Sequence, residues 1–252
     1  MATKLRVMPT LLFKDFGLVK GVSFDSWRRV GSAMQAIKVY NLREVDELVF
    51  LDVAATRDGR EPDFETVDEL ADECFMPLAV GGGIRSVDHV RRLLQVGADK
   101  VALNTAAVEV PDLVGQVSQR FGAQCVVVSI DARRRGSGYE VFTHSGTVAT
   151  GIDPVTLARR VAAAGAGEIL VTSIENDGTM RGYDIELVRS VAQAVSIPVI
   201  ASGGAGEYRH MAEALSLGTA SAVAAASIFH FTERTPLGAK QYLREQGFNV
   251  RI

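Results

Sequence analysis

The stretch Pro77-Leu-Ala-Val-Gly-Gly-Gly-Ile-Arg-Ser86 recurs 121 residues later as Pro198-Val-Ile-Ala-Ser-Gly-Gly-Ala-Gly-Glu207. Each copy is a short apolar run that ends in glycines and leads into a helical pattern. A buried strand followed by a helix in this way brings backbone N–H groups and the positive helix end to a phosphate. The two copies therefore predict two phosphate sites.

Short apolar, β-branched runs alternate with amphipathic helical stretches along the whole chain, as in successive βα units around a parallel sheet. Helical segments such as Val87–Gly97 and Pro154–Gly165 end in a glycine placed to stop the helix. Eight units without a linker predict one (β/α)8 TIM barrel of the α/β class over residues 1–252. The expected strands are Arg6–Phe13, Glu47–Val53, Pro77–Gly82, Lys100–Asn104, Gln124–Asp131, Glu168–Ser173, Pro198–Gly203 and Ala222–Ala226.

The internal repeat extends beyond the glycines, because Phe50-Leu-Asp-Val53 is matched by Val171-Thr-Ser-Ile174. A period of half the chain predicts two four-unit half-barrels, about 1–122 and 123–252, rather than a solenoid of short repeats. In such a barrel the active site lies at the C-terminal ends of the strands.

Composition narrows the class of protein. The chain has 252 residues, a mass of 27.0 kDa and a net charge of -3, with its basic residues scattered, so no nucleic-acid surface is expected. No apolar run approaches the roughly 20 residues of a membrane span, and no signal peptide is evident, which favours a cytoplasmic protein without membrane contact. Cys74 and Cys125 lack metal-ligand spacing, so neither a metal nor another cofactor is expected.

Eight motifs in one order along the chain resemble the HisF family, the cyclase subunit of imidazole glycerol phosphate synthase. The resemblance runs nearly from end to end. The motifs are Gly81-Gly-Gly-Ile-Arg-Ser86, Gly97-Ala-Asp-Lys-Val101, Asn104-Thr-Ala-Ala107, Gly165-Ala-Gly-Glu168, Asp177-Gly-Thr179, Gly182-Tyr-Asp184, Ser202-Gly-Gly-Ala-Gly206 and Ser227-Ile-Phe-His230.

This resemblance implies a partner and a ligand. The family's cyclase takes ammonia from a glutaminase subunit at the bottom of the barrel and adds it to a bisphosphorylated ribulosyl intermediate at the top. One phosphate would be held by Gly82, Gly83, Asn104 and Thr105, and the other by Asp177, Gly178, Gly203, Gly204, Ala226 and Ser227. The alternative is that the glycines only permit tight turns at strand ends.

The family's chemistry uses two aspartates, at the ends of the first and fifth strands, as general acid and base. The second is present as Asp131. Aligning Pro9-Thr-Leu-Leu-Phe-Lys-Asp15 with the family's Pro-Cys-Leu-Asp-Val-Lys-Asp puts Leu12 where the first belongs. Leucine transfers no proton, so cyclase turnover should fall by roughly 10²–10⁴-fold.

Four charged residues stand at strand starts, Arg6, Glu47, Lys100 and Glu168, and match the family's charged gate for ammonia. Two acids and two bases can neutralise each other around an opening, although ordinary surface charges are the alternative. Lys20 falls in the expected long first loop, where the family has a lysine that contacts substrate. A solvated loop lysine is the competing interpretation.

Leu12 and four short sequence segments indicate a more specialised branch of the family. These resemble the glycosyl amidation-associated proteins, HisF-like paralogues that work with a HisH-like glutaminase and an ATP-dependent sugar amidotransferase. The segments are Leu11-Leu-Phe-Lys-Asp-Phe-Gly-Leu-Val-Lys20, Val30-Gly-Ser32, Glu44-Val-Asp-Glu-Leu48 and Glu73-Cys-Phe-Met-Pro77.

Three functions remain open at this point. The first is a barrel that docks a glutaminase and conducts ammonia, for conversion of an acetamido to an acetamidino group on a nucleotide sugar in surface polysaccharide synthesis. The second is a working cyclase of histidine biosynthesis whose missing acid has moved elsewhere. The third is a noncatalytic activator of a glutaminase. Fold alone does not choose among them.

Overall fold

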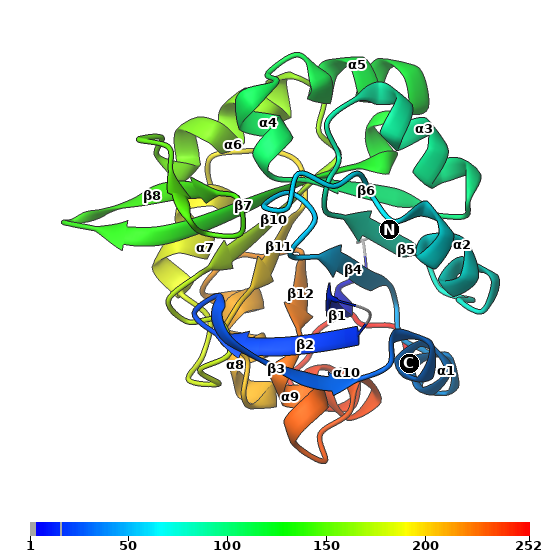
Figure 1. Ribbon diagram of the computed structural model, residues 1–252. Helices are drawn as coiled ribbons and strands as arrows, with labels where there is room; N and C mark the ends of the chain where they lie inside the picture. The colour runs from blue at the N-terminus through cyan, green and yellow to red at the C-terminus, as the bar shows by residue number, and fades with distance from the viewer. Residues whose placement is uncertain (1–3, 16) are drawn as a thin grey trace.

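The computed structural model describes residues 4–15 and 17–252. Eight parallel strands form a closed barrel, in which each strand pairs with the next and the last pairs with the first (Figure 1). In order around the barrel they are β1 (Arg6–Lys14), β4 (Leu48–Asp52), β5 (Leu78–Gly81), β6 (Lys100–Leu103), β7 (Val126–Arg135), β10 (Glu168–Ser173), β11 (Val199–Ser202) and β12 (Ala222–Ala225).

Helices surround the barrel (Figure 1). They are α1 (Ala33–Leu42), α2 (Phe64–Asp72), α3 (Val87–Gln95), α4 (Thr105–Glu109), α5 (Leu113–Phe121), α6 (Pro154–Ala163), α7 (Ile185–Ala192), α8 (Tyr208–Ser216), α9 (Ser227–Phe231) and α10 (Pro236–Glu245). Side-chain oxygens of Ser86 and Asp153 cap α3 and α6, which satisfies their free N–H groups. Gly97 and Gly165 follow the same two helices with φ of 99° and 101°, as their placement in the sequence predicts. Across the described residues, no helix is long and apolar enough to cross a membrane.

Two hairpins extend the barrel where the sequence predicts loops. After β1, β2 (Gly17–Val22) and β3 (Asp25–Gly31) pair antiparallel, and β2 also pairs antiparallel with β1. The fifth barrel strand begins at Val126, after a 3₁₀ turn, and continues to Arg135 because its outer half pairs with β8 (Gly138–Thr143), which pairs in turn with β9 (Val148–Ala149). Hairpin pairing with β8 therefore extends this strand beyond Asp131, where the sequence pattern predicts its end.

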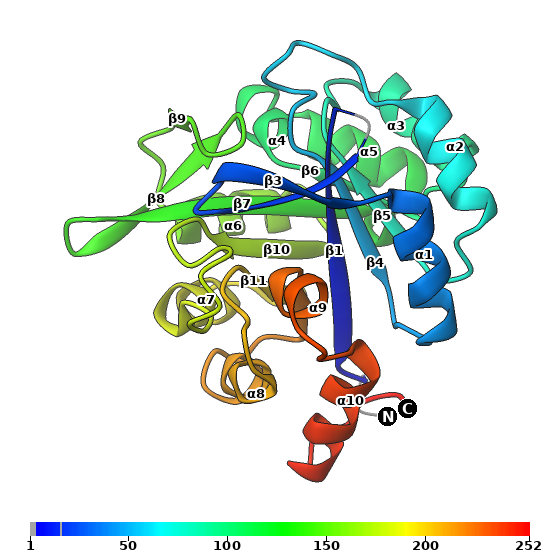
Figure 2. The ribbon, with the colours of Figure 1, turned by 60° about the horizontal axis from the view of Figure 1, so that its bottom comes forward.

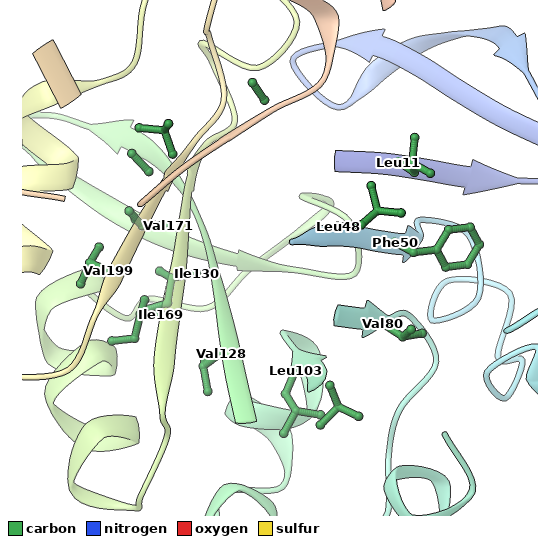
Figure 3. Close-up of a cluster of buried hydrophobic side chains, with 14 of the residues drawn as sticks. Leu11, Leu48, Phe50, Val80, Leu103, Val128, Ile130, Ile169, Val171 and Val199 are labelled. Atoms are coloured by element: carbon green, nitrogen blue, oxygen red, sulfur yellow. The ribbon is translucent and has the colours of Figure 1, made fainter. Parts of the chain in front are cut away.

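Strand alternation divides the core in two. Along β4, Val49 belongs to the cluster inside the barrel. Leu48 and Phe50 belong to the larger cluster between the strands and the helices (Figure 3). The interior side chains form one apolar layer across the barrel. It consists of Met8, Val49, Ala79, Ala102, Val127, Leu170, Ile200, Ala222 and Ala224, with the partly buried Leu51 packed against it.

The last helix, α10, packs at the end of the barrel where β1 begins, and the C-terminus lies beside it (Figure 2). The buried Lys240 of α10 donates to the Glu44 carbonyl oxygen at 2.9 Å and to the Asp46 carboxylate at 3.2 Å. The same carboxylate accepts the N–H of Val7 on β1 at 3.0 Å. Helix α10, β1 and the segment before β4 thus share one buried charge pair.

Replacement of Lys240 by alanine should therefore lower the free energy of unfolding by about 3 kcal/mol, because the Asp46 carboxylate stays buried without its cation. Urea denaturation measures this loss. The matched control is a Lys240→Met, Asp46→Asn double variant, which removes both charges and should recover most of the stability. A loss below about 1 kcal/mol in Lys240→Ala would show that the pair is not needed.

Candidate functional site

A cavity opens at the C-terminal ends of the barrel strands and holds about 1120 Å³ of empty space, including its open mouth. This is the size class of small-molecule sites. All ten residues that the HisF resemblance assigns to two phosphates line it, although they come from both halves of the chain: Gly82, Gly83, Asn104, Thr105, Asp177, Gly178, Gly203, Gly204, Ala226 and Ser227.

The glycines at the cavity wall are required by the backbone itself. Gly82 and Gly204 have φ of 109° and 113°, which side-chain-bearing residues rarely adopt. A Cβ on Gly82 would lie 2.3 Å from the Asp52 carbonyl oxygen, and one on Gly204 would lie 2.1 Å from the Gly182 carbonyl oxygen. These turns need glycine whether or not a phosphate binds, so the glycines alone do not separate the two interpretations.

Hydrogen bonding differs between the two residue sets. In the first set, Gly83 N–H donates to Thr56 Oγ1 at 3.2 Å, and Thr105 Oγ1 accepts the N–H of His144 at 3.0 Å. In the second set, Ser227 Oγ is buried and has no hydrogen-bond partner within residues 4–15 and 17–252. A buried hydroxyl without a partner is costly, so an anion at this place would satisfy it.

The two positions expected to carry the acid and the base occupy equivalent places in the barrel. Leu12 on β1 is paired with Leu51 on β4, and Asp131 on β7 is paired with Thr172 on β10. The sequence repeat matches Leu51 with Thr172. The register therefore places Leu12 where Asp131 stands in the other half, and both side chains line the cavity.

Asp131 lies in an environment that disfavours its charge. Burial raises the pKa of its carboxyl from an ordinary value of 3.8 to about 7, and the nearby charge of Asp177 acts in the same direction. Hydrogen bonds from Ser129, at 3.2 Å, and from Thr172 oppose the rise in pKa. Near neutral pH the carboxyl is therefore balanced between its two protonation states.

Lys20 is buried, with 1% of its surface exposed, rather than solvated in a loop. It lies on β2, and its ammonium group pairs with the Asp177 carboxylate after β10. Two further bonds join the hairpin tip to the same segment, from Ser23 N–H to the Asp177 carbonyl oxygen at 2.8 Å and from Ser23 Oγ to the Glu175 carbonyl oxygen at 3.1 Å. The β2–β3 hairpin thereby forms part of the cavity wall.

The four strand-start charges come together at the opposite end of the barrel. Arg6 pairs with Glu47 at 2.6 Å and with Glu168 at 2.8 Å, and Lys100 pairs with the same two acids at 2.9 and 3.2 Å. Glu47 is buried. The alternative of four separate surface charges does not hold, because each cation contacts both acids in a closed ring.

A family model described as "histidine biosynthesis protein" matches residues 6–235. The chain belongs to this family. The match covers the whole barrel from β1 to the segment before α10, and with the motifs quoted above it identifies a HisF-like member, with a HisF-like synthase as the general kind of activity.

Sequence reasoning missed several residues of the cavity in this family member. Phe24 and Trp27 reach it from the β2–β3 hairpin, and Ser145 reaches it from the turn between β8 and β9. Ser145 Oγ donates to the Val53 carbonyl oxygen at 2.6 Å, which joins that turn to the end of β4. No local pattern marks these residues, because the hairpins that carry them are positioned by distant contacts.

The pKa of Asp131 predicts a pH-dependent stability. From about pH 4 to 7 the folded carboxyl keeps a proton that the unfolded chain releases, so the free energy of unfolding falls as pH rises through this window. An Asp131→Asn variant has no charge to bury. The free energy of unfolding of this variant, relative to that of the native chain, should therefore increase as pH rises, by at most about 4 kcal/mol near pH 8.

Urea denaturation across this pH range measures the difference. The control is Asp88→Asn on α3, since an arginine neighbour lowers the pKa of that exposed carboxyl and any pH trend there runs the other way. A difference between Asp131→Asn and the native chain that stays constant with pH would contradict the assignment of a raised pKa.

Proposed function

We propose that this HisF-like barrel docks a glutaminase at its charged end and conducts ammonia to its upper cavity, for amidation of a nucleotide sugar rather than for imidazole formation. The observation that carries the proposal is the combination of a closed charged ring with Leu12 in the cavity. The charged ring supports an ammonia entry, and Leu12 at the position of the expected first acid argues against cyclase proton transfer.

The ring and the layer above it support ammonia passage. The two acids and two bases of the ring neutralise one another, and any opening must exchange some of these ion pairs. Above the ring lies the apolar layer, in which Ala79, Ala102, Ala222 and Ala224 are small side chains. An apolar path admits neutral ammonia and disfavours ammonium, because a bare charge is costly to bury.

The end of the barrel that bears the ring offers an apolar surface for a partner. Leu42 at the end of α1 and Phe75 before β5 are 87% and 83% exposed. The Asn41 side chain holds the two segments together, donating to the Glu73 carbonyl oxygen at 2.6 Å and accepting the N–H of Phe75 at 3.1 Å. A glutaminase that covers the ring would also cover this rigid pair of side chains.

The cavity supports a phosphorylated ligand. Its two sets of residues face one space, and Ser227 supplies an unpaired hydroxyl to the second set. Leu12 and Leu51 make the cavity wall apolar on the β1–β4 side, across the barrel from Asp131. The nucleotide sugar and the ATP-dependent amidotransferase that receives the ammonia follow from the resemblance to the glycosyl amidation-associated proteins.

The decisive test is cyclase turnover with ammonium chloride and the bisphosphorylated ribulosyl substrate. The native chain should be inactive or nearly so, and Leu12→Asp should gain about 10²-fold or more, because it restores a second proton-transfer group in the same cavity. Leu12→Asn is the matched control, since it adds a polar side chain of the same shape without the acid. Robust turnover by the native chain would overturn the proposal in favour of an ordinary cyclase.

The docking surface predicts a binding defect. Phe75→Asp should weaken binding of a HisH-like glutaminase from the same genome by at least about tenfold, because an exposed aromatic anchor is replaced by a charge. Titration calorimetry measures the dissociation constant. Val148→Asp is the control, since Val148 is also exposed but lies on β9, at the end where the cavity opens. Equal effects of the two substitutions would argue against docking at the ring.

A further inference from the structure

Thr10 lies inside the barrel at the boundary between the apolar layer and the cavity. On β1 the inward positions are Met8, Thr10 and Leu12, because strand residues alternate between two faces. Met8 belongs to the apolar layer, and Leu12 lines the cavity. The Thr10 side chain is thus the first polar group on β1 above the apolar layer.

The hydroxyl of Thr10 is buried and makes no hydrogen bond to the described residues. Only 7% of the residue is exposed, and Oγ1 has no hydrogen-bond partner in the described part of the chain. The hydroxyls of Ser129 and Thr172 differ from it, because Ser129 Oγ donates to the Asp131 carboxylate at 3.2 Å and Thr172 acts to lower the pKa of that carboxyl. A buried hydroxyl that makes no bond reduces stability relative to a methyl group of the same shape, so packing does not explain a threonine here.

The surroundings of Thr10 restrict what could satisfy it. Oγ1 is shielded from solvent, so bulk water does not supply the missing bond. Below it the barrel is filled by the apolar layer, and below that layer lies the charged ring. A molecule that reaches Oγ1 from the ring must be small and uncharged, and must carry hydrogen-bonding groups.

We propose that the Thr10 hydroxyl is the receiving group for neutral ammonia where it leaves the apolar layer and enters the cavity. This inference rests on the ammonia conduit proposed above. It assigns to Thr10 a positioning role: the hydroxyl donates to the ammonia lone pair or accepts one of its N–H groups. No covalent bond forms or breaks in this step.

The chemistry of a hydroxyl suits this role. Threonine is uncharged at physiological pH, so it holds ammonia by hydrogen bonding without converting it to ammonium, which has no lone pair for attack. Ser129 lies on β7, across the barrel from β1. Its hydroxyl donates a hydrogen bond to Asp131, so its oxygen lone pairs can accept an N–H of ammonia. Two hydroxyls on facing strands can therefore bind ammonia in turn.

Stability measurements separate an unused hydroxyl from a structural one. Thr10→Val replaces the hydroxyl by a methyl group and should leave the melting temperature unchanged or raise it by roughly 2–4 °C, because an unpaired polar group is removed. Ser129→Ala is the control, since it removes a hydroxyl of equal burial that is bonded to Asp131, and it should lower the melting temperature. Equal losses in both variants would show that Thr10 is structurally bonded and would overturn the proposal.

Direct binding is tested on the purified chain by nuclear magnetic resonance, with ammonium chloride as the probe and potassium chloride as the salt control. Well above the pKa of ammonium, titration should shift the backbone signals of Thr10 and Ser129. Well below that pKa the shifts should vanish, because only ammonium is present. Thr10→Val should weaken the binding about five- to tenfold, the loss of one hydrogen bond, and Thr10→Ser should keep it.

The outcomes distinguish this inference from the proposed function. Shifts that are absent, or that persist unchanged in Thr10→Val, overturn the role of Thr10 and leave glutaminase docking and the Leu12→Asp result as they stand. Shifts that depend on Thr10, in a chain that binds no glutaminase, would support an ammonia site while removing the proposed source of the ammonia.

Discussion

The closure of eight parallel strands into one barrel is the constraint on which every other feature depends. Hydrogen bonding around the ring of strands fixes the register of each strand against its neighbours, and alternation then decides which side chains point inward. This places Glu47, just before β4, and Val49 and Leu51, on β4, at successive heights along the barrel. Charges, apolar groups and cavity-lining groups consequently form layers along the barrel axis.

The two ends of this barrel treat buried charge in opposite ways. At the strand starts, Glu47 and Glu168 each contact two cations, so burial is compensated by direct ion pairs. At the strand ends, Asp131 has hydroxyl partners but no cation in contact among the described residues, and the pKa of its carboxyl rises to about 7. Buried carboxyl groups are therefore held as ion pairs at the strand starts, whereas the buried carboxyl at the strand ends titrates near neutral pH.

Leu12 changes what this titrating group can do. The resemblance to the HisF family implies two carboxyls at equivalent positions across the cavity, which could divide the roles of acid and base. With leucine on β1, the Asp131 carboxyl has no second acid at the symmetry-related position. The glycine turns and the cavity are present, so under the proposed function the leucine removes a proton-transfer group and leaves the binding surface in place.

The sequence by itself determined the strand order, the glycine-rich strand ends and the substitution at Leu12, because these follow from short-range periodicity and from a repeat that can be read directly. Only the tertiary structure decided that Arg6, Glu47, Lys100 and Glu168 form a closed ring, since the ion pairs join strands that are distant in the chain.

Inside the barrel, too, several features depend on contacts that local sequence patterns do not predict. The packing of remote segments buries Lys20 beside Asp177, raises the pKa of the Asp131 carboxyl and leaves the Thr10 hydroxyl without a partner among the described residues. Burial and hydrogen bonding are properties of the assembled barrel, and no local pattern in the sequence encodes them.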